Sequence, residues 1–243
     1  MRSRTIEIHS KDRGLPFYVH ETLLREASGL YGAMIDHVLK TTGKAAMRLN
    51  LSHGALAIWT MWLYGTPMVD DANPDIEHLE PLLELYEYSH HRTRPEADHK
   101  CANACLDAIC TILDDQFDEF QFTNIFGHGN VPTFVDIITR LHACNGLGPQ
   151  MVVDLMAHGE RDAEAVYKTI LNIEPVPSLA IFFHRLSYAM ARECASETNM
   201  RGKEPGEPVE HISLPDPTEE PHRYHTHRAG EALCCGRQAE NDK

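Results

Sequence analysis

The sequence predicts an α/β chain of the α+β kind, in which a small sheet with clustered helices is followed by an all-α extension and a disordered tail. Alternating apolar and polar residues near the N-terminus are typical of strands. From residue 20 onward the apolar spacing is helical, and from residue 193 onward prolines and charges replace apolar residues. We therefore expect three parts: residues 1–116, 117–192 and 193–243.

The composition of the chain argues against several classes of partner and location. The chain has 243 residues, 42% of them hydrophobic, which is enough for a real core. Its formal charge of -14 argues against nucleic acid or an anionic membrane surface as the main partner, because binding phosphate takes a basic face. No window approaches the roughly 20 apolar residues of a membrane span, and no signal peptide precedes the first strand pattern. Seven scattered cysteines suit a reducing compartment, so we expect cytoplasm or nucleus.

The first predicted element is a β-hairpin over residues 5–19. Ile6 and Ile8 alternate with polar neighbours, residues 11–14 are a polar turn, and residues 17–19 return as a second strand. A helical stripe follows, interrupted by Gly29, so we expect two short helices that meet near Ser28. Residues 41–44 are then a loop, and residues 45–51 a third strand.

The next element is a helix that we expect to be buried. Ser52 is a good N-cap, and Gly65 suits the left-handed turn beyond the last helical residue. Between them the chain is apolar on every face and carries both tryptophans, Trp59 and Trp62. A helix that is apolar all round is typical of a core, so both tryptophans are expected to be buried.

Helices dominate the remainder up to residue 192. One starts near Glu80, with Pro81 at its first position, and ends near residue 91; a longer one begins near residue 95. A Phe-rich connector over residues 117–132 leads to further helical segments, which we place at residues 133–144, 150–158, 162–171 and 178–192. Beyond residue 193, five of the chain's 14 prolines lie between Pro205 and Pro221, which predicts disorder.

Several segments of this frame, in this order, resemble one known family. They are Phe17-Tyr18-Val19-His20-Glu21-Thr22-Leu23-Leu24, Ser28 with Tyr31, Leu49-Asn50-Leu51, Trp62-Leu63-Tyr64-Gly65, Leu82-Leu83-Glu84-Leu85-Tyr86, and Asn103 with Leu106. Together they resemble the BTB/POZ domain, particularly that of fungal BTB proteins with a helical C-terminal extension, over roughly residues 5–115. The segment Met151-Val152-Val153-Asp154-Leu155 is similar to the back half of those fungal proteins. The resemblance implies a non-enzymatic protein-interaction module that forms a homodimer or acts as a scaffold, with protein partners.

Two departures from the family bear on the partners. Many members exchange an N-terminal helix and strand between protomers, whereas only four residues precede the first strand here. Members that serve cullin-type ubiquitin ligases as substrate adaptors present a hydrophobic residue, any residue and then an acid in a loop after the second short helix. The matching stretch is Leu39-Lys40-Thr41, in which Thr41 replaces the acid. We therefore expect cullin to bind weakly or not at all, and keep the adaptor role as the alternative.

No residue pattern predicts catalysis or a cofactor. The chain has no Gly-rich phosphate loop, no Gly-x-Ser-x-Gly and no His-Glu-x-x-His. Asp114, Asp115, Asp118 and Glu119 gather at a helix end without a nucleophile, as on a solvated face. His20 lies at a strand-to-helix junction, where we expect a structural hydrogen bond.

Two parts of the sequence contain residue types that can bind a metal ion. His99, Cys101 and Cys105 share a helix, but no Cys-x-x-Cys pair accompanies them, so we expect core cysteines. The tail gathers His222, His225, His227, Cys234 and Cys235. A structural metal site normally supplies its own fold and apolar support, so we assign no metal there. A metal-binding protein or an enzyme built on the extension and tail is the other alternative, and would need a pocket with convergent polar groups.

Overall fold

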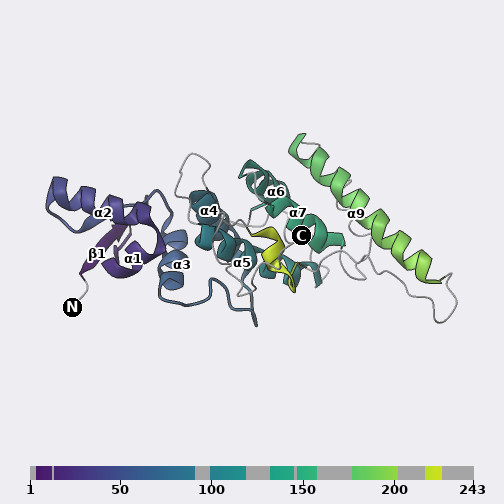
Figure 1. The fold of residues 1–243 in the computed structure, drawn as a ribbon, viewed down its shortest axis with the longest axis horizontal. Helices are drawn as coiled ribbons and strands as arrows, with labels where there is room; N and C mark the ends of the chain where they lie inside the picture. Colours follow the sequence, from purple (N-terminus) through teal and green to yellow (C-terminus); the bar gives the residue numbers. More distant parts are fainter. Residues whose placement is uncertain are drawn as a thin grey trace, which may run out of the picture. The chain divides into compact units, whose positions relative to one another are not determined.

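The computed structural model describes residues 4–12, 14–90, 99–118, 132–144, 147–157, 177–201 and 217–225 (Figure 1). The chain divides into two units, residues 1–109 and 110–243, and the division falls within helix α5 (His99–Asp118). The predicted boundary after residue 116 lies in the same helix. The described residues are mostly helical with one small mixed sheet, which is an α+β architecture. In this part of the chain no helix is both long and apolar enough to cross a bilayer.

Unit 1 is built on a three-stranded sheet with the order β2-β1-β3. Strand β1 (Thr5–His9) pairs antiparallel with β2 (Phe17–His20) and parallel with β3 (Ala46–Arg48). The predicted hairpin is confirmed. The third strand is shorter than expected, although backbone hydrogen bonds continue past it from Leu49 N–H to His9 O and from Lys11 N–H to Leu51 O.

Ser28 separates two helices, as predicted. Helix α1 (Glu21–Ala27) ends where the backbone of Ser28 becomes extended, and α2 (Gly29–Thr42) begins with the Ser28 hydroxyl accepting from Leu30 N–H at 3.2 Å. Helix α2 ends at Gly43, whose φ of +65° is the left-handed conformation that glycine adopts without strain. The loop expected from residue 41 therefore begins two residues later.

Helix α3 (His53–Leu63) has the predicted caps but is not buried on all sides. The Ser52 hydroxyl accepts from Ala55 N–H at 3.2 Å, and Gly65 has a φ of +83°. Trp59 is fully buried, with its ring centroid 5.0 Å from that of Tyr31. The prediction that Trp62 is equally buried is wrong: it is only partly covered. Helix α3 packs on α1, β2 and the following helix α4 (Leu79–His90), and these neighbours cover one side of it only.

Glu84 of α4 connects three segments of unit 1. Its Oε1 accepts hydrogen bonds from Ser52 N–H at 3.0 Å and from the Lys11 ammonium at 2.5 Å. The carboxylate thus fixes both the start of α3 and the turn after β1. Helix α4 itself is preceded by a 3-10 turn, η1 (Ile76–His78), so that Pro81 lies in its third position, still within the first turn.

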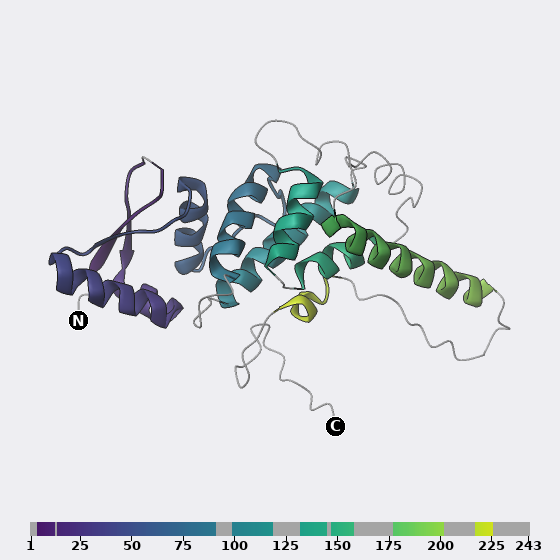
Figure 2. The ribbon, with the colours of Figure 1, turned by 90° about the horizontal axis from the view of Figure 1, so that it is seen from above.

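Unit 2 contains three described helices that pack on one another. They are α6 (Phe134–Ala143), α7 (Gly148–Ala157) and α9 (Pro177–Arg201). Helix α6 begins with a capping box between Thr133 and Asp136. Nearly all of α7 is buried. Figure 1 and Figure 2 both show the C-terminal part of α9 extending beyond α6 and α7.

The disorder predicted for residues 193–243 is wrong for two segments. Helix α9, expected to end near Arg192, continues to Arg201. Residues 217–225 contain the short helix η2 (Pro221–Tyr224), which packs on α7 and buries Tyr224. Composition missed this segment because only a few of its side chains are buried, among them Pro217, Tyr224 and His225. The predicted helix at residues 162–171 and most of the connector over 117–132 lie outside the described residues, as do residues 202–216 and 226–243.

Candidate functional site

Strand β2 and the end of helix α3, which contact each other in unit 1, carry exposed side chains, and we call four of these residues, Tyr18, His20, Met61 and Tyr64, the aromatic patch. Side chains alternate along β2, so that Val19 is buried while Tyr18 and His20 face outward. Met61 and Tyr64 come from the C-terminal end of α3, three residues apart and therefore on one face. Tyr18, Met61 and Tyr64 are 62%, 52% and 47% exposed, which is unusual for side chains of this size.

Hydrogen bonds join the two elements of the aromatic patch. The Tyr64 hydroxyl accepts from the backbone N–H of His20 at 3.2 Å and lies 2.7 Å from His20 Nδ1. The two rings also meet edge to face, with centroids 5.8 Å apart. His20 thus has the structural hydrogen bond expected at its junction. These contacts hold the Tyr64 ring in one orientation at the surface.

The predicted adaptor residues Leu39, Lys40 and Thr41 do not lie in a loop. All three belong to the last turn of α2. The Thr41 hydroxyl donates to the carbonyl of His37 at 2.8 Å, within its own helix. Leu39 lines a small apolar depression with neighbours from α2, β1 and β3. The stretch therefore presents neither a loop nor a carboxylate.

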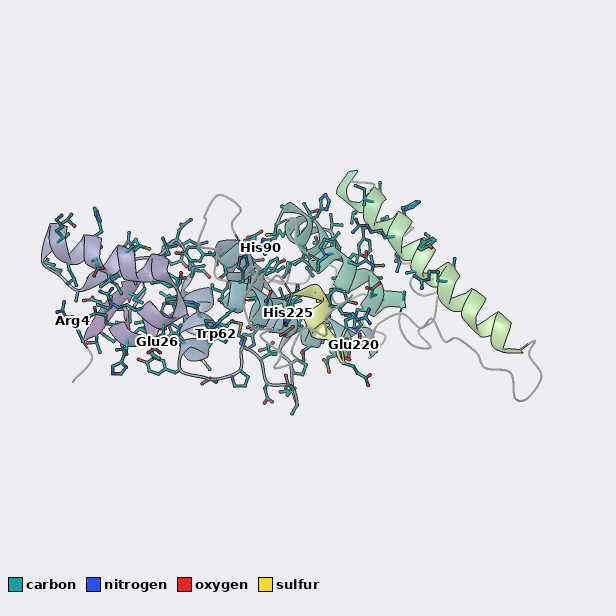
Figure 3. The ribbon with its side chains drawn as sticks, in the orientation of Figure 1. Arg4, Glu26, Trp62, His90, Glu220 and His225 are labelled. Atoms are coloured by element: carbon teal, nitrogen blue, oxygen red, sulfur yellow. The ribbon has the colours of Figure 1, made fainter. Side chains whose placement is uncertain are left out.

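The predicted metal and acid groups remain apart or fall outside the description. Cys101 and Cys105 are buried free thiols of α5, as expected for core residues. Of the tail candidates, His225 is buried beside η2 (Figure 3), whereas His227, Cys234 and Cys235 and the side chain of His222 lie outside the described residues. Among the residues that are described, no three His, Cys, Asp or Glu side chains gather as they would around a metal ion. Asp114 and Asp115 lie in α5, the side chain of Asp118 and all of Glu119 lie outside the description, and the Asp115 carboxylate accepts from the Gln116 amide.

The comparisons with known proteins found no match: no family model, no curated protein and no solved structure matches the chain.

A buried carboxylate in unit 2 is the residue that sequence reasoning missed. Asp154 is 5% exposed, and its two oxygens accept hydrogen bonds at 2.8 Å, one from the Tyr224 hydroxyl and one from the Gln150 amide. Burial raises the pKa of Asp154, while these hydrogen bonds and the charges of Arg192 and Arg223 oppose the rise. Burial and the bond to Asp154 likewise raise the pKa of Tyr224.

The surface next to Asp154 is an open groove of about 480 Å³ between α7 and α9. It is lined by Gln150, Asp154, His184, Arg185, Tyr188, Ala189 and Arg192. The sequence carried one signal of it: the polar residues recur at intervals of four, as 150 and 154 on α7 and as 184, 188 and 192 on α9. None of the described lining residues is Ser, Thr or Cys; their polar groups are guanidinium, imidazole, phenol, amide and carboxylate groups, which can bind a ligand.

Proposed function

We propose that the chain is a non-enzymatic protein-interaction module of BTB/POZ type, which self-associates or acts as a scaffold through unit 1. The aromatic patch carries this proposal. Tyrosine and methionine are enriched at the centres of interfaces, where a few large side chains supply most of the binding energy. The patch combines such side chains with an orientation fixed by the bond between Tyr64 and His20.

The order of elements in unit 1 supports the same proposal. A hairpin, a pair of helices that meet at Ser28, a third strand, the capped helix α3 and the helix α4 follow one another as the resemblance implies. The side chains of Tyr18 and His20 on strand β2 are exposed, so they are available to a partner. A second copy of the chain is the partner that we propose, patch against patch around a two-fold axis.

We place this function in the cytoplasm or nucleus. The cysteines are scattered along the sequence, and Cys101, Cys105, Cys110 and Cys144 are buried free thiols. Such thiols are usual in a reducing compartment.

Sedimentation equilibrium of the full chain tests the proposal. We expect a dimer with a dissociation constant in the range of about 1–100 µM. The double variant Tyr18→Arg with Met61→Arg should weaken the dimer at least tenfold, because it places two like charges in the contact of each protomer. The matched control is Tyr188→Arg, which changes an equally exposed tyrosine of α9 and should leave the dissociation constant unchanged.

Two results would count against the proposal. A monomer over the whole concentration range would exclude self-association and leave only a different protein as partner. A dimer that the double variant does not weaken would place the contact away from the aromatic patch.

The adaptor role has less support. The Leu39-Lys40-Thr41 stretch is helical, and its threonine hydroxyl bonds to its own backbone. An enzyme or metal protein built on unit 2 is supported only by the groove between α7 and α9, whose described lining residues supply polar groups but include no Ser, Thr or Cys.

A further inference from the structure

The groove between α7 and α9 has the size of a small-molecule site. Its volume of about 480 Å³ lies within the range of about 300–1,000 Å³ that is usual for ligand pockets. Gln150 and Asp154 form one wall, one helical turn apart on α7. His184, Tyr188 and Arg192 follow at successive turns on α9 and form the other wall, with Ala189 between them.

The charges that line the groove are mostly positive. Arg185 and Arg192 contribute two guanidinium groups, and neither forms an ion pair within the described part of the chain. Asp154 is the single acid of the lining, and both of its oxygens are already occupied by Tyr224 and Gln150. On a chain of net charge -14, two guanidinium groups beside one groove are a local exception that favours an anion.

An apolar surface accompanies these charges. Tyr188 is 64% exposed and lies between Arg185 and Arg192 along α9. The small side chain of Ala189 leaves room beside it. A flat apolar group can lie against the tyrosine ring while an anionic group on the same molecule reaches a guanidinium.

We propose that this groove binds a small organic anion in which a carboxylate, sulfonate or phosphate group is attached to a flat apolar body. Arg185 and Arg192 bind the anionic group, and Tyr188 contacts the apolar body. Asp154 and Gln150 form the opposite wall, where the Asp154 carboxylate accepts hydrogen bonds from Tyr224 and Gln150. This site is independent of the aromatic patch on unit 1.

A pair of fluorescent probes separates the two contributions. The anionic probe is 1-anilinonaphthalene-8-sulfonate, and the neutral one is N-phenyl-1-naphthylamine, which has the same rings without the sulfonate. We expect the full chain to bind the anionic probe at least tenfold more tightly than the neutral probe. Raising the salt concentration should reduce this preference, because the guanidinium groups are exposed.

The double variant Arg185→Gln with Arg192→Gln tests the assignment of residues. It should bind the anionic probe at least tenfold more weakly than the unchanged chain and bind the neutral probe equally well. The matched control Leu15→Ser alters an 84% exposed apolar side chain of unit 1 outside the aromatic patch and should leave the affinity for the anionic probe unchanged. Equal melting temperatures of the variants and the unchanged chain verify that the fold is intact.

Three outcomes would overturn the proposal. The first is an anionic probe that binds no more tightly than the neutral one. The second is undiminished binding to the Arg185→Gln, Arg192→Gln variant. The third is loss of binding in the Leu15→Ser control, which would move the site to unit 1. If the double arginine variant does not fold, Tyr188→Ala replaces it, and unchanged affinity for both probes then contradicts the proposal.

Discussion

Trp59 and Trp62 are three residues apart in α3, and their surroundings differ. Trp59 is fully buried against Tyr31, whereas Trp62 is partly exposed. Trp59→Ala should cost about 3–5 kcal/mol of unfolding free energy, because it leaves a cavity in the core. Trp62→Ala should cost about 1 kcal/mol, since part of its surface is already in water. Urea denaturation followed by circular dichroism compares the two, and an equal cost would show that Trp62 belongs to the core.

The hydroxyl of Tyr224 is the hydrogen-bond donor to a buried carboxylate. Tyr224→Phe keeps the ring and removes this donor, so it should cost about 1–3 kcal/mol. Tyr188→Phe is the matched control, because the Tyr188 side chain is 64% exposed and its hydroxyl is accessible to water. The melting temperatures of the two variants provide the measurement. A Tyr224→Phe variant as stable as its control would show that the bond contributes nothing.

Asp154 makes stability depend on pH in a defined direction. Burial raises its pKa, so the folded chain binds a proton at a higher pH than the unfolded chain, where the pKa is about 3.9. The stability that Asp154 contributes is therefore fully present below the unfolded pKa and is lost as pH rises through the folded pKa. Asp154→Asn does not titrate, and its stability relative to the unchanged chain should increase with pH across this window and then become constant. Urea midpoints at a series of pH values measure the difference, and a difference that does not vary with pH would contradict the raised pKa.

At the scale of the element, η2 makes the C-terminal segment a part of unit 2. A chain that ends at residue 225 keeps Tyr224 on α7, whereas one that ends at residue 216 loses it. The chain that ends at residue 216 should lose about 2–5 kcal/mol of unfolding free energy, because it lacks a buried ring and a hydrogen bond. The chain that ends at residue 225 should have the same melting temperature as the full-length protein. Calorimetry of the two truncations tests this expectation, and equal melting temperatures would show that the segment is dispensable.

The elements that could be predicted from the sequence are those with local signals. Ser52 precedes an apolar run and caps α3 as predicted. Two helices meet at Ser28 as predicted, and its hydroxyl also caps α2. The predicted ends of the elements were less accurate. Helix α2, for example, continues to Thr42, and the hydroxyls of Thr41 and Thr42 donate to carbonyls of the preceding turn. The exposure of Trp62 could not be predicted, since it depends on which faces of α3 other elements cover.

At the scale of the whole molecule, neither the groove between α7 and α9 nor the hydrogen bond from Tyr224 to Asp154 was predicted from the sequence. The two residues are 70 positions apart, so no short-range pattern links them. The amino-acid composition of residues 193–243 gives no indication that Tyr224 is buried. The BTB/POZ type of the chain stays a prediction, which rests on the order of its motifs.

The adaptor alternative is tested by titrating the full chain with the N-terminal fragment of a cullin. The carboxylate that Thr41 replaces would supply a charge-assisted hydrogen bond of about 1.5–3 kcal/mol, so its absence weakens binding by about ten- to a hundredfold. We expect weak binding or none. Thr41→Asp should restore part of the affinity, although an acid in the last turn of α2 is unfavourable for the helix dipole. Submicromolar binding of the unchanged chain would make the adaptor role the better proposal.

The central position of β1 has a consequence for synthesis on the ribosome. Its antiparallel partner β2 follows within the next residues, but its parallel partner β3 begins 41 residues after Thr5. At about 5–20 residues per second, translation needs about 2–8 s to pass from one strand to the other. During this interval the nascent hairpin has an open edge on β1, and a two-stranded hairpin is only marginally stable in water. The edge of β1 that β3 covers therefore stays open until residues 46–48 have been made, and during that time it can pair with a strand of another chain.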